Sequence, residues 1–125
     1  MPVKPGLHAS VEMVVGDGDT AIAMRSGSVP VLATPRVIAL AEEASVLAVE
    51  GCFAPNETTV GMRIQLDHVN PTAVGGRVTA EATLTAVEGR RLTFTVNVQD
   101  ARGVIAVGKV TRVVVDRERF LDKAH

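Results

Sequence analysis

The chain has 125 residues, of which 46% are hydrophobic, 2% aromatic and 22% charged, with a formal net charge of −1 at pH 7. The length suits one domain, 1–125, and the near-neutral charge with few aromatics speaks against nucleic acid or an anionic membrane as partner. No apolar run approaches the ~18 residues of a membrane span, and the single cysteine, Cys52, excludes an internal disulfide, so we expect a cytoplasmic protein.

The first predicted element is a strand at residues 8–15, in which Val11, Met13 and Val15 alternate with more polar residues. The cluster GDGDT that follows is typical of a turn. Residues 20–33 show no sustained period, and the pattern there predicts at most a short strand or a helical turn.

Residues 34–51 form the best predicted helix. Thr34 suits the N-cap, Pro35 suits the first helical position because its missing N–H has no partner there, and Gly51 suits the C-terminal end. At 100° per residue, one face carries small and mostly apolar side chains that allow close approach to a sheet: Val37, Ile38, Ala41, Ala44, Ser45 and Ala48.

Four more strands are predicted from apolar alternation, at 58–68, 77–87, 91–99 and 104–115. Short turns that contain glycine join the last three, which indicates an antiparallel meander. One helix on one face of this sheet gives a two-layer α+β domain. The nearly continuous apolar runs of the last strand predict a homodimer, although burial within one chain would also explain them.

His68 breaks the apolar pattern of its strand. It stands in phase with Val60, Met62, Ile64 and Leu66, so its ring points to the side where a Leu or Val is expected. A partly buried imidazole titrates near neutrality and can act as general base or acid. The alternative is a histidine at a strand end that only hydrogen-bonds to a loop.

Three further polar residues are candidates. Glu42 flanks the buried helix face among apolar neighbours, where a carboxylate needs a partner, although a boundary glutamate can be ordinary. Arg112 lies in phase with apolar residues of the last strand and either holds a carboxylate or phosphate or lies along an edge. Thr34, beyond capping, stands where a helix N-terminus favours a developing oxyanion, so its hydroxyl is placed to touch a substrate carbonyl.

The chain resembles the hotdog-fold thioesterases, most closely the fluoroacetyl-CoA thioesterase-like group. Three stretches carry the resemblance and cover nearly all of 33–116: ATPRVIALAEEAS, TTVGMRIQLDHVNPTAVGGRVTAEATL and FTVNVQDARGVIAVGKVTRVVVD. In that group a Thr opens the central helix, a Glu lies eight residues on, and a His follows 26 residues after the Glu. Thr34, Glu42 and His68 match both spacings.

Two more positions of the group are matched, a glycine in the strand before the histidine by Gly61 and an arginine in the last strand by Arg112. The resemblance implies that both contact the substrate, with the Gly61 N–H as a donor to the oxyanion. It implies His68 as general base and acid, Glu42 as the residue that orients or activates, and Thr34 as nucleophile or as the group that positions water or the carbonyl.

The resemblance also implies a hotdog fold, in which an antiparallel sheet wraps around one long helix. A homodimer with active sites at the subunit interface is expected, and a back-to-back tetramer stays open. The implied reaction is hydrolysis of an acyl-CoA thioester to a carboxylic acid and free CoA. No metal or bound cofactor is expected, because CoA is part of the substrate.

One departure from the group concerns its lid, which carries phenylalanines in the fluoroacetyl-specific member. The corresponding stretch here, DGDTAIAMRSGSVPVLA, has no aromatic residue, and we expect Met24, Val29, Val31 and Leu32 to line a different acyl pocket. Two other functions stay open: a hotdog enoyl-CoA hydratase or dehydratase, and an acyl-CoA-binding dimer without catalysis.

Overall fold

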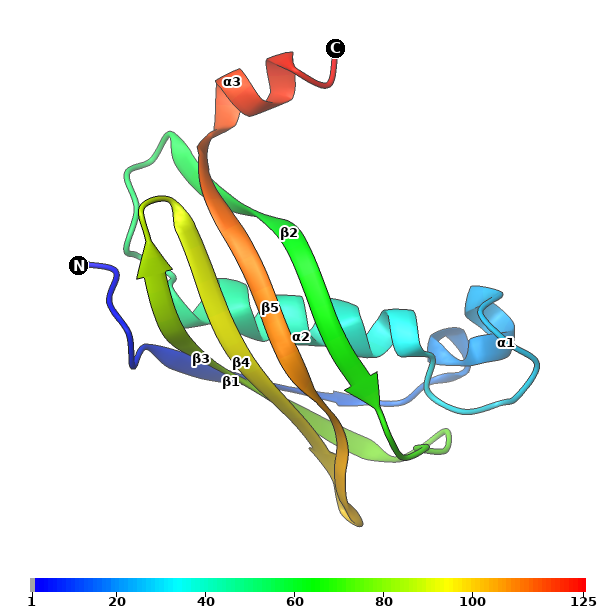
Figure 1. Ribbon diagram of the computed structural model, residues 1–125. Coiled ribbons are helices and arrows are strands. Elements are labelled where there is room, and N and C mark those ends of the chain that lie inside the picture. The colour runs from blue at the N-terminus through cyan, green and yellow to red at the C-terminus, as the bar shows by residue number, and fades with distance from the viewer. Residues whose placement is uncertain (1) are drawn as a thin grey trace.

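One antiparallel sheet curves around one long helix in the computed structural model, which describes residues 2–125 (Figure 1). Across the sheet the strands follow the order β1 (His8–Val14), β3 (Arg77–Glu88), β4 (Arg91–Asp100), β5 (Gly103–Asp116) and β2 (Glu57–His68). All neighbouring strands are antiparallel, and β3, β4 and β5 form the expected meander. The α+β architecture predicted from the sequence is confirmed.

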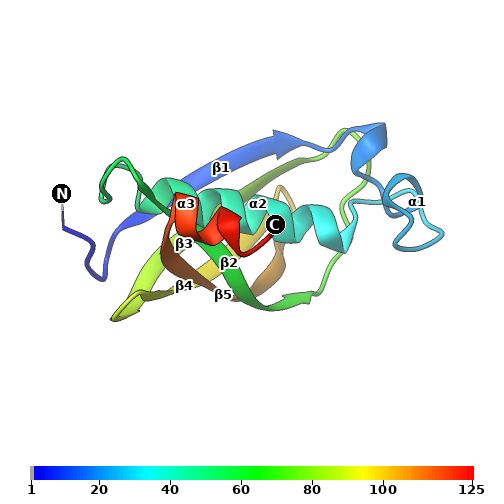
Figure 2. The same cartoon turned by 90° about the horizontal axis from the view of Figure 1, so that it is seen from above.

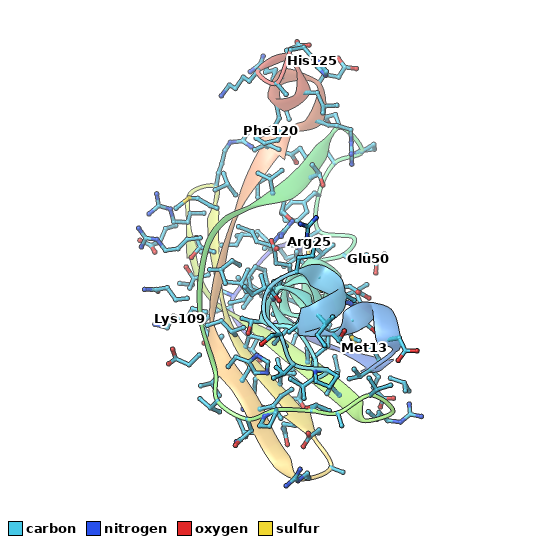
Figure 3. The ribbon with its side chains drawn as sticks, turned by 90° about the vertical axis from the view of Figure 1, so that its right-hand side faces the viewer. Met13, Arg25, Glu50, Lys109, Phe120 and His125 are labelled. Atoms are coloured by element: carbon cyan, nitrogen blue, oxygen red, sulfur yellow. The ribbon has the colours of Figure 1, made fainter. Side chains whose placement is uncertain are left out.

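The helix α2 (Thr34–Ala48) lies in the hollow of the curved sheet (Figure 2). Its small residues Ala41 and Ala44 are fully buried, so the helix backbone approaches the strands closely. Strict alternation on β3 and β4 turns a row of apolar side chains toward the helix, all of them buried: Val78, Ala80, Ala82, Leu84, Leu92, Phe94, Val96 and Val98. The outer face of the sheet is more polar, and Lys109 of β5 points away from the helix (Figure 3).

The start of α2 differs from the prediction. Ala33 occupies the N-cap position with extended backbone and no side-chain cap, and Thr34 is already the first helical residue. The predicted capping role of Thr34 is therefore wrong, and the Thr34 hydroxyl is free for another partner. The helix also ends earlier than predicted, at Ala48 rather than Gly51.

The strand β2 contains a bulge that the alternation did not reveal. Gly61 is opposite Arg112 and Arg63 is opposite Thr111, so Met62 is one extra residue on β2. The predicted even-numbered phase therefore holds only beyond the bulge, from Ile64 to His68, and Met62 is 45% exposed. The bulge lets Gly61, on the odd-numbered side before it, face the same helix as the even-numbered residues after it.

Three short helices complete the structure: η1 (Asp17–Asp19), α1 (Ala21–Met24) and α3 (Arg117–Asp122). η1 lies in the predicted GDGDT turn, α1 is the helical turn that the segment 20–33 allowed, and α3 was not predicted. The first two lie beside the N-terminal end of α2, while α3 projects beyond the sheet (Figure 1). No helix within residues 2–125 has the length and apolar character needed to cross a membrane.

Candidate active site

Thr34 and His68 meet at one end of the molecule. The first residue of α2 and the last residue of β2 place the Thr34 Oγ1 2.8 Å from the His68 Nδ1, which is a hydrogen bond. The other ring nitrogen, Nε2, is buried and has no hydrogen-bond partner within residues 2–125. The Nδ1 atom is therefore the ring nitrogen with a defined partner, the Thr34 hydroxyl.

The environment of His68 favours the neutral imidazole. Burial lowers the pKa of His68 below its usual value of 6.5, while the backbone of Asn70 acts in the opposite direction. A neutral ring at pH 7 has a lone pair on one nitrogen. With that lone pair on Nδ1, the Thr34 hydroxyl donates the hydrogen bond and His68 is poised to accept its proton.

The turn after His68 is fastened to the beginning of β5. The backbone N–H groups of Val69 and Asn70 both donate to the Ile105 carbonyl, at 2.8 and 3.3 Å. The Asn70 side-chain amide adds a bond of 2.9 Å to the Val104 carbonyl. These bonds end β2 abruptly and hold the imidazole at the rim between helix and sheet.

A second fastening joins this turn to the segment that enters α2. The Thr72 carbonyl accepts a bond of 2.9 Å from the Leu32 N–H, two residues before Thr34. The Thr72 hydroxyl, on a residue only 5% exposed, donates to the Asp100 Oδ2 at 2.8 Å, and the Asp100 Oδ1 accepts from the Arg102 N–H at 2.8 Å. We call the hydrogen bond between the Thr72 hydroxyl and the Asp100 carboxylate the Thr72–Asp100 link. It steadies the turn that follows His68, and that turn also holds the segment that leads to Thr34.

Glu42 and Arg112 belong to a separate cluster near the middle of α2. The Arg112 guanidinium donates to the Glu42 Oε2 at 2.8 Å, to the Thr59 hydroxyl at 3.0 Å and to the Thr59 carbonyl at 2.9 Å. Arg112 is 8% exposed, so these bonds use its donors in a largely buried place. The sequence predicted Arg112 as a substrate contact, and that stays a prediction, but in the structure its partners are Glu42 and Thr59.

Gly61 borders the same cluster. A Cβ atom on Gly61 would overlap the Glu42 Oε2, so the carboxylate occupies the space that any side chain there would need. We call these residues the Glu42 cluster: Glu42, Thr59, Gly61 and Arg112. The glycine is thus explained by the close approach of a carboxylate.

The two groups of candidate residues are not joined within one chain. Eight residues of helix separate Thr34 from Glu42, a rise of about 12 Å. Within residues 2–125, no hydrogen bond connects Glu42 to Thr34 or His68. The prediction that Glu42 orients or activates stays a prediction, and one copy of the chain does not show the contact that it needs.

A cavity of about 300 Å³ opens at the Thr34–His68 pair, and both residues line it. Its walls include Val29, Val31 and Leu32, which were expected there, whereas Met24 is outside the lining. Thr59 and Asp100 carried no signal in the sequence, because each is an ordinary polar residue of a strand. Their place in the site becomes apparent only from the residues to which they hydrogen-bond in the structure.

Comparison with known proteins places the chain in a family. Residues 15–118 match the family model described as FlK, fluoroacetyl-CoA-specific thioesterase. The chain belongs to this family. Among its relatives, the fluoroacetyl-CoA thioesterase of Streptantibioticus cattleyicolor is 37% identical over 90 residues, which are 72% of this chain and 65% of that protein.

Solved structures confirm the hotdog fold. A mutant of the fluoroacetyl-CoA thioesterase FlK in complex with acetyl-CoA superposes with a TM-score of 0.92 at 30% identity, covering 98% of this chain and 96% of that one. A hot-dog-like protein from Thermanaerovibrio acidaminovorans superposes with a TM-score of 0.88 at 23% identity, covering 96% and 89%. The second likeness concerns the fold alone.

Proposed function

We propose that the protein is an acyl-CoA thioesterase that hydrolyses a thioester to a carboxylic acid and free CoA. Membership of the family and the acetyl-CoA complex of its structural relative support this activity. The observation that carries it is the 2.8 Å hydrogen bond between the Thr34 hydroxyl and the His68 Nδ1 at the wall of a cavity. A hydroxyl beside a neutral imidazole is the arrangement that acyl transfer uses to make a nucleophile.

In the proposed first step, the thioester carbonyl lies near the N-terminus of α2. The His68 Nδ1 takes the proton of Thr34 as its Oγ1 attacks the carbonyl carbon. The C–S bond then breaks, and the departing CoA sulfur receives that proton from His68. Backbone N–H groups stabilise the oxyanion between these events, and losing one such donor lowers the rate by about 10²–10³.

In the second step, His68 takes a proton from water, whose oxygen attacks the acyl ester of Thr34. The ester bond breaks, the carboxylic acid leaves, and the Thr34 oxygen regains its proton from His68. If Thr34 instead positions water, the same base serves a single displacement without an acyl-enzyme. Trapping an acylated Thr34 by rapid quenching and mass spectrometry separates these routes. Neither route uses a metal or a bound cofactor.

We further propose that Glu42 of the partner subunit completes the Thr34–His68 pair of the first subunit in a homodimer. The strand β2 lies at an edge of the sheet, where it pairs only with β5 and its other side has no neighbouring strand within residues 2–125. Met62 of this strand is 45% exposed, and Val46 of α2, which lines a cavity together with Thr58 and Thr59 of β2, is 43% exposed. A long edge with apolar neighbours favours a second copy, whose Glu42 cluster would supply the carboxylate and the Gly61 N–H.

Subunit complementation tests both parts of this proposal. His68→Ala and Glu42→Gln are each expected to abolish most release of CoA thiol from acyl-CoA. After unfolding and refolding an equal mixture, half of the dimers carry one intact site, so about a quarter of the wild-type activity should return. A mixture as inactive as its parents would contradict the shared site. Wild-type chain that releases no thiol, or that only hydrates enoyl-CoA, would contradict the thioesterase itself.

A further inference from the structure

The wall of the cavity beside Thr34 is apolar and aliphatic. Besides Thr34 and His68, it is formed on one side by Ala21, Val29, Val31 and Leu32, from the segment that leads into α2. Leu32 is 1% exposed and Ala21 is 7% exposed, so the deeper part of this wall is fixed by the core. An acyl chain whose carbonyl lies at Thr34 would therefore extend along the methyl groups of these wall residues.

The size of the cavity favours an acyl group of medium length. Its volume of about 300 Å³ is at the lower end of the range for pockets that bind small organic ligands, and it is open to solvent. A two-carbon acyl group leaves most of that space to water against apolar walls, whereas a long fatty chain would extend out of the opening into solvent. An aliphatic chain of about four to eight carbons fills it and removes that apolar surface from contact with water.

The lining that one chain supplies offers no partner for a second charge on the acyl group. Within residues 2–125, that lining includes no lysine, arginine or acidic residue, and its polar side chains besides Thr34 and His68 are Ser26 and Asn70. The nearby Arg36 is already bonded to Asp19 at 3.1 Å. A carboxylate at the far end of an acyl chain would lose its hydration with no cation to pair with.

Two lining side chains carry this apolar character to the surface. Val29 is 52% exposed, and Val69, on the turn after His68, is 56% exposed. An aliphatic chain, and not a small polar acid, would cover these two exposed apolar side chains.

We infer that this cavity binds the acyl group, and that the preferred substrates are CoA thioesters of uncharged aliphatic acids of about four to eight carbons. The inference rests on the proposed thioesterase function and assigns its substrate class. It separates this chain from a specificity for fluoroacetyl-CoA, the substrate named for its relatives.

The test is a series of CoA thioesters assayed by thiol release with the full chain: fluoroacetyl, acetyl, butyryl, hexanoyl, octanoyl, palmitoyl and succinyl. Each methylene that enters the apolar cavity should raise kcat/KM about fourfold from acetyl to hexanoyl. Palmitoyl-CoA and succinyl-CoA should both be poorer than hexanoyl-CoA by at least about tenfold.

Two variants fill the cavity independently, Val29→Phe at an exposed position and Val31→Phe at a half-buried one. Either should lower the hexanoyl-to-acetyl ratio of kcat/KM by about tenfold or more. The control is Val107→Phe on the outer face of β5, 39% exposed, which adds the same ring away from the cavity and should leave the ratio unchanged.

Each outcome has one meaning. A maximum at butyryl to octanoyl that both phenylalanine variants remove supports the inference. A maximum at fluoroacetyl, acetyl, palmitoyl or succinyl, or a ratio that neither folded variant changes, overturns the inference and leaves the thioesterase standing. Hydrolysis of none of the thioesters overturns the proposed function together with it.

Discussion

Thr34 and His68 are 34 residues apart in the chain, and their side chains share a hydrogen bond of 2.8 Å between Oγ1 and Nδ1. The bond joins the start of the long helix α2 to the end of an edge strand, so two elements with separate neighbours must both be in place. The Nε2 of the same ring has no hydrogen-bond partner within residues 2–125, so Nδ1 is the ring nitrogen with a defined partner. The bond is therefore the feature that the first experiments should disturb.

Substitutions at this pair should separate hydroxyl chemistry from packing. Thr34→Val keeps the shape but removes the hydroxyl, and His68→Ala removes the base, so each should lower kcat/KM by about 10²–10⁴. Thr34→Ser keeps a hydroxyl and should retain most activity. Thr95→Val on the exposed face of β4 is the matched control. Near-wild-type turnover in Thr34→Val would remove the hydroxyl from the mechanism, and near-wild-type turnover in His68→Ala would remove the base.

The pH dependence of activity should report on His68. Its pKa in the folded protein is lowered from 6.5 by burial, and only the neutral ring accepts a proton. The acid limb of kcat/KM should therefore have its midpoint below pH 6.5. A midpoint above pH 6.5 that disappears in His68→Gln would contradict the effect of burial.

The same shift makes a contribution to stability with a defined sign. The unfolded chain binds the His68 proton at a higher pH than the folded chain does, because the folded pKa is lower. As pH falls from 6.5 through the folded pKa, the free energy of unfolding contributed by this residue decreases. Urea unfolding at pH 7.5 and pH 5 should show a smaller loss of stability in His68→Gln than in wild type.

Much of the fold was predictable from local rules. Period-two alternation gave the strands of the meander because one face of that sheet packs on a core, and the Pro35 signal gave the start of α2 within one residue. The bulge at Met62 was not predictable, since a single extra residue leaves the composition of β2 unchanged. The alternation therefore assigned the wrong face to the residues before it, and Gly61 was the only local sign of a close approach.

The candidate site was predictable only in part. His68 and Glu42 stood out because a polar residue interrupted an apolar pattern, but nothing in the sequence paired Thr34 with His68 except the spacing typical of a family. The partners of Arg112 depend on which strand lies beside β5, and that is decided by long-range pairing. For the same reason the pairing of Thr72 with Asp100, 28 residues apart, carried no signal.

The Thr72–Asp100 link should act on activity through position. Thr72→Val removes the hydroxyl that bonds Asp100 at 2.8 Å, so the turn after His68 loses one of its supports while the Leu32 N–H still bonds the Thr72 carbonyl. We expect kcat to fall about tenfold or more with a smaller change in KM, because misplacing reacting groups by about 1 Å is costly. Thr72→Ser keeps the hydroxyl and should restore kcat, which a purely packing effect of the lost methyl would not allow.

A stability control accompanies this comparison. Leu84→Ala opens a cavity in the core near the opposite end of β3, where Leu84 is fully buried, and should lower the free energy of unfolding by about 2–5 kcal/mol. Assayed well below its melting temperature, it should keep its kcat. If Leu84→Ala and Thr72→Val lose kcat in proportion to their loss of stability, the link is structural and does not position the site.

Gly61→Ala should displace the Glu42 carboxylate. The new Cβ would overlap the Glu42 Oε2, and because Arg112 holds that carboxylate at 2.8 Å, the strain must spread through the Glu42 cluster. The alanine keeps the backbone N–H, so lost activity reports on the carboxylate rather than on a missing donor. We expect kcat/KM to fall about tenfold or more and stability to fall by about 1–3 kcal/mol, as in other overpacked sites.

Two companions make the Gly61 experiment specific. Gly18→Ala adds a methyl group where no atom lies within 4 Å and should change neither activity nor stability. Glu42→Asp withdraws the carboxylate by one methylene, so the double variant with Gly61→Ala should be more active than the product of the two single effects predicts. Strict additivity would show that Gly61 and Glu42 act independently, and full activity in Gly61→Ala would show that the position of this carboxylate does not limit the reaction.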